Sequence, residues 1–142
     1  MKHFLLVIFF LSASLCFGQK SASIVGHWKT IDDETGKAVS VVEIFEHKGK
    51  FYGRIIELLN PSDRTKTCEN CDGADKDKPI MGLNVIKGLV KDGADYTGKI
   101  LDPKHGRIYQ CNLKLEGKDK LKVRGFVGIS LFGRTQFWYR VK

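Results

Sequence analysis

Residues 107–127, RIYQCNLKLEGKDKLKVRGFV, carry the clearest pattern in this chain. Up to position 115 the side chains alternate, and one face of the stretch holds Tyr109, Cys111, Leu113 and Leu115. After a turn at residues 116–119, one face holds Leu121, Val123 and Val127, and the other holds Lys122 and Arg124. A period of two is typical of antiparallel strands that bury one face. The stretch therefore predicts a pair of β-strands over 107–115 and 121–127.

Short apolar runs of the same kind, separated by turn residues, recur along the rest of the chain. They predict further strands at 24–31, 39–46, 51–59, 80–86, 96–101 and 133–141. Residues 87–93 are expected to form a turn or a short helical piece, and residues 62–79 a long solvated loop. Eight antiparallel strands close most economically into an up-and-down barrel, because closure removes the edge strands. Such a barrel is either filled by its own side chains or holds one small ligand.

The start of the chain has the features of an export signal. Residues 1–3 form a short basic segment, residues 4–11 form an unbroken apolar run, and Gly18 is a small residue suited to cleavage. The apolar run is shorter than the roughly 20 residues that a membrane-spanning helix needs. We therefore expect a secretory signal peptide at 1–18 and one domain at 19–142, without a transmembrane segment after cleavage. The mature protein should be periplasmic or extracellular.

Composition favours a globular domain with a basic surface. The 142 residues are 42% hydrophobic and 28% charged, with a formal net charge of +8. That length excludes a multidomain enzyme. A basic net charge is typical of proteins that bind nucleic acid. The lysines of this chain are spread over many turns, however, so we do not expect nucleic-acid binding. Acidic envelope components or anionic membrane surfaces suit a basic exported protein better.

Two resemblances to known families extend this interpretation. The Gly26-His27-Trp28 segment and Arg140 resemble the lipocalin pattern, in which an arginine of the last strand caps the tryptophan of a Gly-x-Trp motif. That resemblance implies structural roles for Gly26, Trp28 and Arg140.

A longer resemblance covers most of the chain. Its blocks are 26–33 (GHWKTIDD), 51–55 (FYGRI), 68–71 (CENC), 101–103 (LDP), 109–111 (YQC), 123–128 (VRGFVG) and 131–141 (LFGRTQFWYRV). Together they are similar to a family of small exported bacterial proteins catalogued as domain of unknown function twenty-one forty-seven. The resemblance implies a lipocalin-type barrel and secretion, with no assigned activity.

Loss of Cys16 with the signal peptide would leave Cys68, Cys71 and Cys111. In an oxidising compartment two of these three should pair, and we expect a Cys68–Cys71 disulfide that pins the long loop. A redox Cys-x-x-Cys site is disfavoured, because nearby acidic residues would raise the thiol pKa. Cys111 lies on an apolar strand face and is expected to be a buried free thiol. A bond from Cys111 to Cys68 or Cys71 is the alternative.

Metal and catalytic motifs are weak. A zinc site would need Cys111 and one of the histidines beside the Cys68/Cys71 pair, and their spacing does not demand it. Asp72, Asp75 and Asp77 suggest calcium, but the residues between them break the EF-hand pattern. The chain lacks a Gly-x-Ser-x-Gly elbow, a His-Glu-x-x-His motif and a phosphate loop. We therefore expect no metal or cofactor, and a non-enzymatic role over a hydrolase or redox enzyme.

Charged and aromatic residues in the strands are the candidates for a ligand site. Two guanidiniums, of Arg124 and Arg134, could clamp a carboxylate or phosphate at one barrel mouth. The alternative is that each pairs with an internal acid such as Glu43 or Asp102, or lies on the outer face. The candidate ligand-binding residues are Trp28, Arg54, Arg124, Arg134 and Trp138.

These patterns predict an exported lipocalin-like protein that binds a small apolar or anionic molecule. The alternative is a non-catalytic interaction or structural protein of the cell envelope, with a filled barrel and a basic binding surface.

Overall fold

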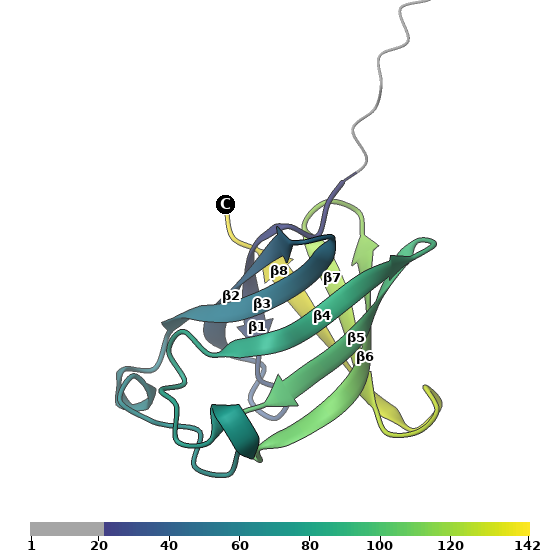
Figure 1. Cartoon of the computed structure of the whole chain (residues 1–142). Helices are drawn as coiled ribbons and strands as arrows, with labels where there is room; N and C mark the ends of the chain where they lie inside the picture. Colours follow the sequence, from purple (N-terminus) through teal and green to yellow (C-terminus); the bar gives the residue numbers. More distant parts are fainter. Residues whose placement is uncertain (1–21) are drawn as a thin grey trace, which may run out of the picture.

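The computed structural model describes residues 22–142, so the predicted signal peptide at 1–18 lies outside the described residues. Eight antiparallel strands pair in sequence order to form a closed barrel (Figure 1), which confirms the predicted architecture. The strands are β1 (Gly26–Ile31), β2 (Ala38–His47), β3 (Lys50–Leu58), β4 (Asn84–Asp92), β5 (Asp95–Asp102), β6 (Arg107–Glu116), β7 (Lys120–Phe126) and β8 (Gly133–Arg140). Two short 3-10 turns, η1 (Pro61–Asp63) and η2 (Gly73–Asp75), lie in the β3–β4 connection. Within residues 22–142 no helix is long and apolar enough to cross a membrane.

The fourth strand differs from its predicted extent at both ends. Pairing starts at Asn84 and runs to Asp92, so the prediction of a turn or helical piece at 87–93 is wrong. The strand continues through a bulge, in which Gly88 has a left-handed backbone (φ 64°) and the pairing with β5 shifts between Lys87 and Val90. A bulge adds one residue and breaks the alternation of side chains, which is why the sequence pattern ended too early.

The two ends of the barrel are built differently. The β1–β2, β3–β4, β5–β6 and β7–β8 connections lie at one end, here called the loop end, and the two termini lie at the other, the terminal end (Figure 1). At the terminal end the residues just before β1 enter the barrel, as the complete burial of Ile24 shows. The indole Nε1 of Trp28 donates to the carbonyl of Ile24 over 2.7 Å. The N-terminal segment therefore plugs this end.

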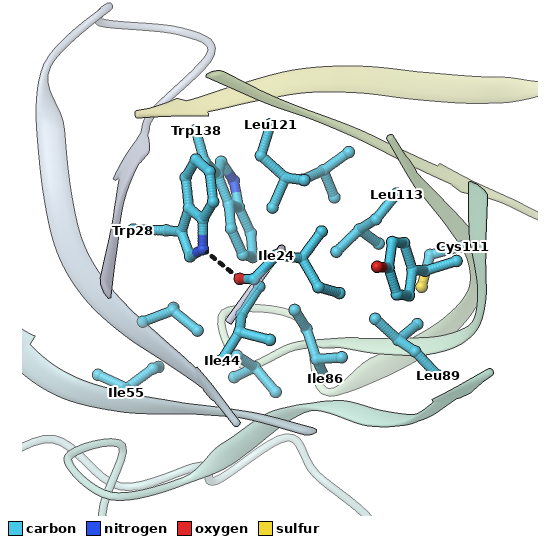
Figure 2. Packing of buried hydrophobic residues seen from close by; sticks show 14 of the residues in the cluster. Ile24, Trp28, Ile44, Ile55, Ile86, Leu89, Cys111, Leu113, Leu121 and Trp138 are labelled. Carbon is cyan, nitrogen blue, oxygen red and sulfur yellow. Dashed lines mark hydrogen bonds between the residues drawn. The ribbon is translucent and has the colours of Figure 1, made fainter. Parts of the chain in front are cut away.

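Inward-facing side chains of all eight strands fill the interior above that plug (Figure 2). The fully buried members include Trp28, Ile44, Ile86, Leu89, Leu113 and Leu121. Cys111 belongs to the same cluster as a free, buried thiol. Its burial in apolar surroundings raises the pKa of the thiol to about 12. The side chain therefore stays neutral and acts as a small apolar residue.

The long β3–β4 connection packs onto the barrel through its own small core. Cys68 and Cys71 form a disulfide, as predicted, and both are buried with Leu83 and Leu101. The amide of Asn70 donates to a carbonyl in the β5–β6 turn over 3.2 Å. The connection is therefore anchored to the loop end, although many of its side chains are exposed.

Candidate functional site

Strands β1 and β8 close the barrel over a short distance only. They pair at Trp28↔Arg140 and Lys29↔Tyr139, near the terminal end. Toward the loop end their pairing stops, and a cleft of about 210 Å³ opens across this seam. It is lined by Ile31, Asp32, Asp33, Gly36, Thr135, Gln136, Phe137 and Tyr139, and we call it the seam cleft. Its walls thus combine apolar side chains with two carboxylates and an amide.

A chain of polar contacts runs from solvent through the seam cleft into the core. Nε of Arg134 lies 2.7 Å from Oδ2 of Asp33, and the amide of Gln136 donates to the same oxygen over 3.0 Å. The buried indole of Trp138 donates in turn to Oε1 of Gln136 over 3.3 Å. The side chain of Arg134 is 66% exposed, so its guanidinium is open to an incoming anionic group. The cleft therefore presents an amide beside apolar walls, and Asp33 links it to the exposed cation of Arg134.

The carboxylates of the cleft are already satisfied by the chain. The backbone N–H groups of Thr35 and Glu34 donate to Oδ1 of Asp32, and the bond from Thr35 is the main cause that lowers the pKa of this carboxyl. Asp33 is paired with Arg134 and Gln136. Both carboxylates therefore have hydrogen-bond donors, and Asp33 is in addition paired with a cation.

Polar residues that were not singled out in the sequence also face the interior. Thr30 and Ser40 are buried on β1 and β2, with their hydroxyl oxygens 2.6 Å apart. Gln136 lies two residues before Trp138 and therefore on the same face of β8. The alternation in the sequence could have identified Gln136, because a polar side chain on the face of a buried tryptophan needs a partner.

The three residues of the lipocalin-like pattern meet at the terminal end. The guanidinium of Arg140 lies 4.3 Å from the centre of a ring of Trp28. Gly26 leaves room for it, because a Cβ there would lie 2.6 Å from Nη1 of Arg140. Arg140 also donates to three backbone carbonyls, those of Ser23, Val25 and Lys118, over 2.8–3.0 Å. Trp28 is thus enclosed by the chain, with its Nε1 bonded to Ile24.

The structure does not bring the other predicted arginines to the seam cleft. Arg54 lies on the outer face of β3, where its Nε is 2.9 Å from a carboxylate oxygen of Glu43. Arg124 donates to the carbonyl of Ser130 over 2.7 Å and to the hydroxyl of Thr135 over 2.8 Å. It therefore holds the β7–β8 connection and does not form a clamp with Arg134. Of the five candidate ligand residues, Arg134 and Trp138 belong to one network.

A second cleft lies between the disulfide loop and β6. It measures about 340 Å³ and is lined by Cys71, Asp72, Asp75, Leu101, Gly106, Arg107, Ile108, Tyr109 and Val127. Of its two acids, Asp75 is already engaged, because its Oδ2 lies 2.6 Å from Nζ of Lys87. Within the described part of the chain, no three His, Cys, Asp or Glu side chains converge as a metal site would require.

Comparison with known proteins places the chain in a family. Protein HP1028 from the human pathogen Helicobacter pylori, described as belonging to the lipocalin family, has a similar structure. The TM-score is 0.76 at 23% sequence identity, over 86% of this chain and 85% of that one, which shows a shared fold. No curated protein matches the chain. The model of the family "Uncharacterized protein conserved in bacteria (DUF2147)" matches residues 26–140 and thus all eight strands. The chain therefore belongs to this bacterial family and has a lipocalin-like barrel.

Proposed function

We propose that this protein is an exported, non-catalytic lipocalin-like protein that binds a small molecule with an apolar body and an anionic group at the seam cleft. The observation that carries the proposal is the polar chain from Arg134 through Asp33 and Gln136 to Trp138. Binding pockets combine apolar walls with a few polar groups that fix the orientation of the ligand. The seam cleft has both.

An anionic ligand would bind to Arg134 and Gln136, the two residues that donate to Asp33, either together with Asp33 or in its place. Its carboxylate would accept from the exposed guanidinium of Arg134 and from the amide of Gln136. Its apolar part would lie against Ile31 and Phe137, which line the same cleft. The cleft is smaller than pockets for drug-sized ligands, which span roughly 300–1,000 Å³. This favours a short amphiphile.

Two chemical probes test the class of ligand. Octanoate should bind and change the fluorescence of Trp138, and octylammonium, which has the opposite charge on a chain of the same length, should bind more weakly. Arg134→Ala should weaken octanoate binding about tenfold, since a hydrogen bond to a charged group contributes about 1.5 kcal/mol or more. Arg54→Ala is the matched control, because it removes an arginine from another exposed ion pair.

Three outcomes contradict the proposal: no binding of either probe, tighter binding of octylammonium, or equal loss in the two arginine variants. Native mass spectrometry of the protein exported by a bacterial host adds an independent test. A mass present under native conditions and absent under denaturing conditions identifies a natural ligand, and the denatured mass locates the cleavage site of the signal peptide.

A second candidate function is that of an interaction protein of the cell envelope with a basic binding surface. The observation that favours it is the filled interior, where Ile24, Trp28 and buried side chains from all eight strands pack in one cluster. Net positive charge would attract acidic envelope components. Salt-sensitive binding to isolated envelope fractions supports this function, and no binding at low salt contradicts it.

A further inference from the structure

The β7–β8 connection carries apolar side chains on the outside of the molecule. Val127, Ile129, Leu131 and Phe132 are each 58–77% exposed, and we call these four residues the apolar tip. Scattered apolar residues on a surface are ordinary, whereas a contiguous group marks an interaction site. Four large apolar residues within one hairpin connection form such a group.

The backbone of this connection is held in place from the barrel side. Arg124 donates to the carbonyls of Ser130 and Leu131, over 2.7 and 3.4 Å. The N–H of Phe132 donates to the carbonyl of Ile129 over 3.1 Å. These bonds fix the backbone while the side chains of the apolar tip remain in solvent. The tip is thus presented in a defined conformation and does not fold back onto the barrel.

Exposed cations lie at the same end of the barrel as the apolar tip, together with one exposed acid, Asp72, in the cleft that Val127 and Arg107 share. Arg107 lines the same cleft as Val127, and Lys104 lies in the neighbouring β5–β6 turn. On the outer face of the sheet, Lys99 of β5 pairs in register with Gln110, which in turn pairs with Phe126 beside the tip. Exposed apolar side chains with several cations on the same end of the molecule match a surface that is apolar inside and negative at its boundary.

We propose that the apolar tip inserts into the surface of an anionic lipid bilayer, with Lys99, Lys104 and Arg107 against the lipid headgroups. The tip is one protruding hairpin connection, and such a shape suits shallow insertion of roughly 5–10 Å into the headgroup region. Juxtamembrane cations are attracted by the negative potential of anionic leaflets. The proposal rests on the envelope-interaction function above, and it names the surface and the partner.

A second copy of the chain is the competing occupant of the tip. In a two-fold dimer the same patch meets itself, so Arg107 and Lys104 of each copy would approach the same cations of the other. Like charges facing each other oppose such a contact. A negatively charged bilayer has the complementary charge, which is why the observations favour it.

Vesicle sedimentation tests the proposal with the full-length mature protein. The vesicles are phosphatidylcholine alone, or phosphatidylcholine and phosphatidylglycerol in equal parts. The protein should sediment with the anionic vesicles, less so at high salt. The double variant Leu131→Ser/Phe132→Ser should weaken this partitioning roughly a hundredfold, because it removes two large apolar side chains. Lys104→Gln/Arg107→Gln should weaken binding to anionic vesicles roughly thirtyfold and leave binding to neutral vesicles unchanged.

The control variant Ile56→Ser/Val90→Ser removes two exposed apolar side chains from β3 and β4 and should bind like the wild type. Equal binding of the tip variant and the wild type overturns the proposal, as does the absence of vesicle binding. A dimer in lipid-free solution that dissociates in the tip variant assigns the tip to a second copy, which also overturns it. Binding to envelope fractions without binding to vesicles overturns the bilayer proposal and leaves the envelope function standing.

Discussion

Replacement of Arg140 by alanine should destabilise the protein by removing contacts at the terminal end of the barrel. The guanidinium bonds to three backbone carbonyls, two in the segment before β1 and one in the β6–β7 turn, and it stacks on Trp28. It therefore joins three parts of the chain that are distant in sequence. Arg140→Ala removes all of these contacts at once.

The expected loss follows from the contacts. The side chain of Arg140 is 23% exposed, so water can reach part of the site after truncation. Each lost bond to a carbonyl then costs about 1 kcal/mol, and the cation–π contact adds about 1 kcal/mol. The sum is about 4 kcal/mol, a large part of the roughly 5–15 kcal/mol that stabilises a typical domain. For a chain of this size, the Tm should fall by about 15 °C.

Equilibrium urea unfolding, followed by tryptophan fluorescence, measures the loss. Arg140→Lys keeps a charge near Trp28 but cannot reach three carbonyls at once, so its stability should lie between those of the wild type and Arg140→Ala. Arg134→Ala is the control, because an exposed ion pair contributes at most about 1 kcal/mol. A loss below 1 kcal/mol in Arg140→Ala, or equal losses in the Arg140→Ala and Arg134→Ala variants, would refute the reasoning.

Three further predictions concern buried groups. Thr30→Val should cost about 1–2 kcal/mol by leaving the hydroxyl of Ser40 unpaired, and adding Ser40→Ala should recover part of it; strictly additive losses in urea unfolding would contradict this. The thiol of Cys111 should resist Ellman's reagent at pH 8 in the native protein and react after unfolding. The folded pKa of the Cys111 thiol, about 12, lies above the unfolded value, so the stability that this thiol contributes at neutral pH should be lost as pH rises from about 9 to 12. Cys111→Ala should lose less stability than the wild type over this range. The same dependence of stability on pH in both proteins would argue against burial as the cause of the raised pKa. Replacing Cys68 and Cys71 together by alanine should lower global stability by about 2 kcal/mol or less, since the disulfide closes a ring of few residues; a loss above 4 kcal/mol would show that the loop supports the barrel.

The barrel could be predicted from the sequence because its signal is local. Alternation in β6 and β7 depends only on which face of a strand is buried, and the pattern at 107–127 shows this directly. The Cys68–Cys71 disulfide could be predicted for the same reason, since two cysteines that are close in one loop can pair without any contact between distant segments. The prediction for β4 was wrong at Gly88, where a bulge interrupts the alternation although the strand continues.

The candidate site depends on closure of the barrel. Asp33 and Arg134 belong to opposite ends of the chain, and they meet because β1 and β8 are neighbours in the closed sheet. The sequence indicated that arginines near the last strands were of interest, but it could not separate Arg134 from Arg124. That choice depends on which face of its strand each side chain occupies and on which loop lies within reach.

The sequence by itself determined the fold class, the eight-strand order and the local disulfide, because each follows from short-range patterns of polarity and spacing. Only the tertiary structure decided how particular side chains are used. The apolar residues of 127–132 look like core residues in the sequence, yet they lie outside because Arg124 holds their backbone at the rim. Gln136 shares a strand face with Trp138, but its other partner, Asp33, reaches it only because β1 and β8 are neighbours in the closed sheet. The contact of Arg124 is local to the β7–β8 hairpin, whereas that of Gln136 with Asp33 joins opposite ends of the chain that only the closed barrel brings together.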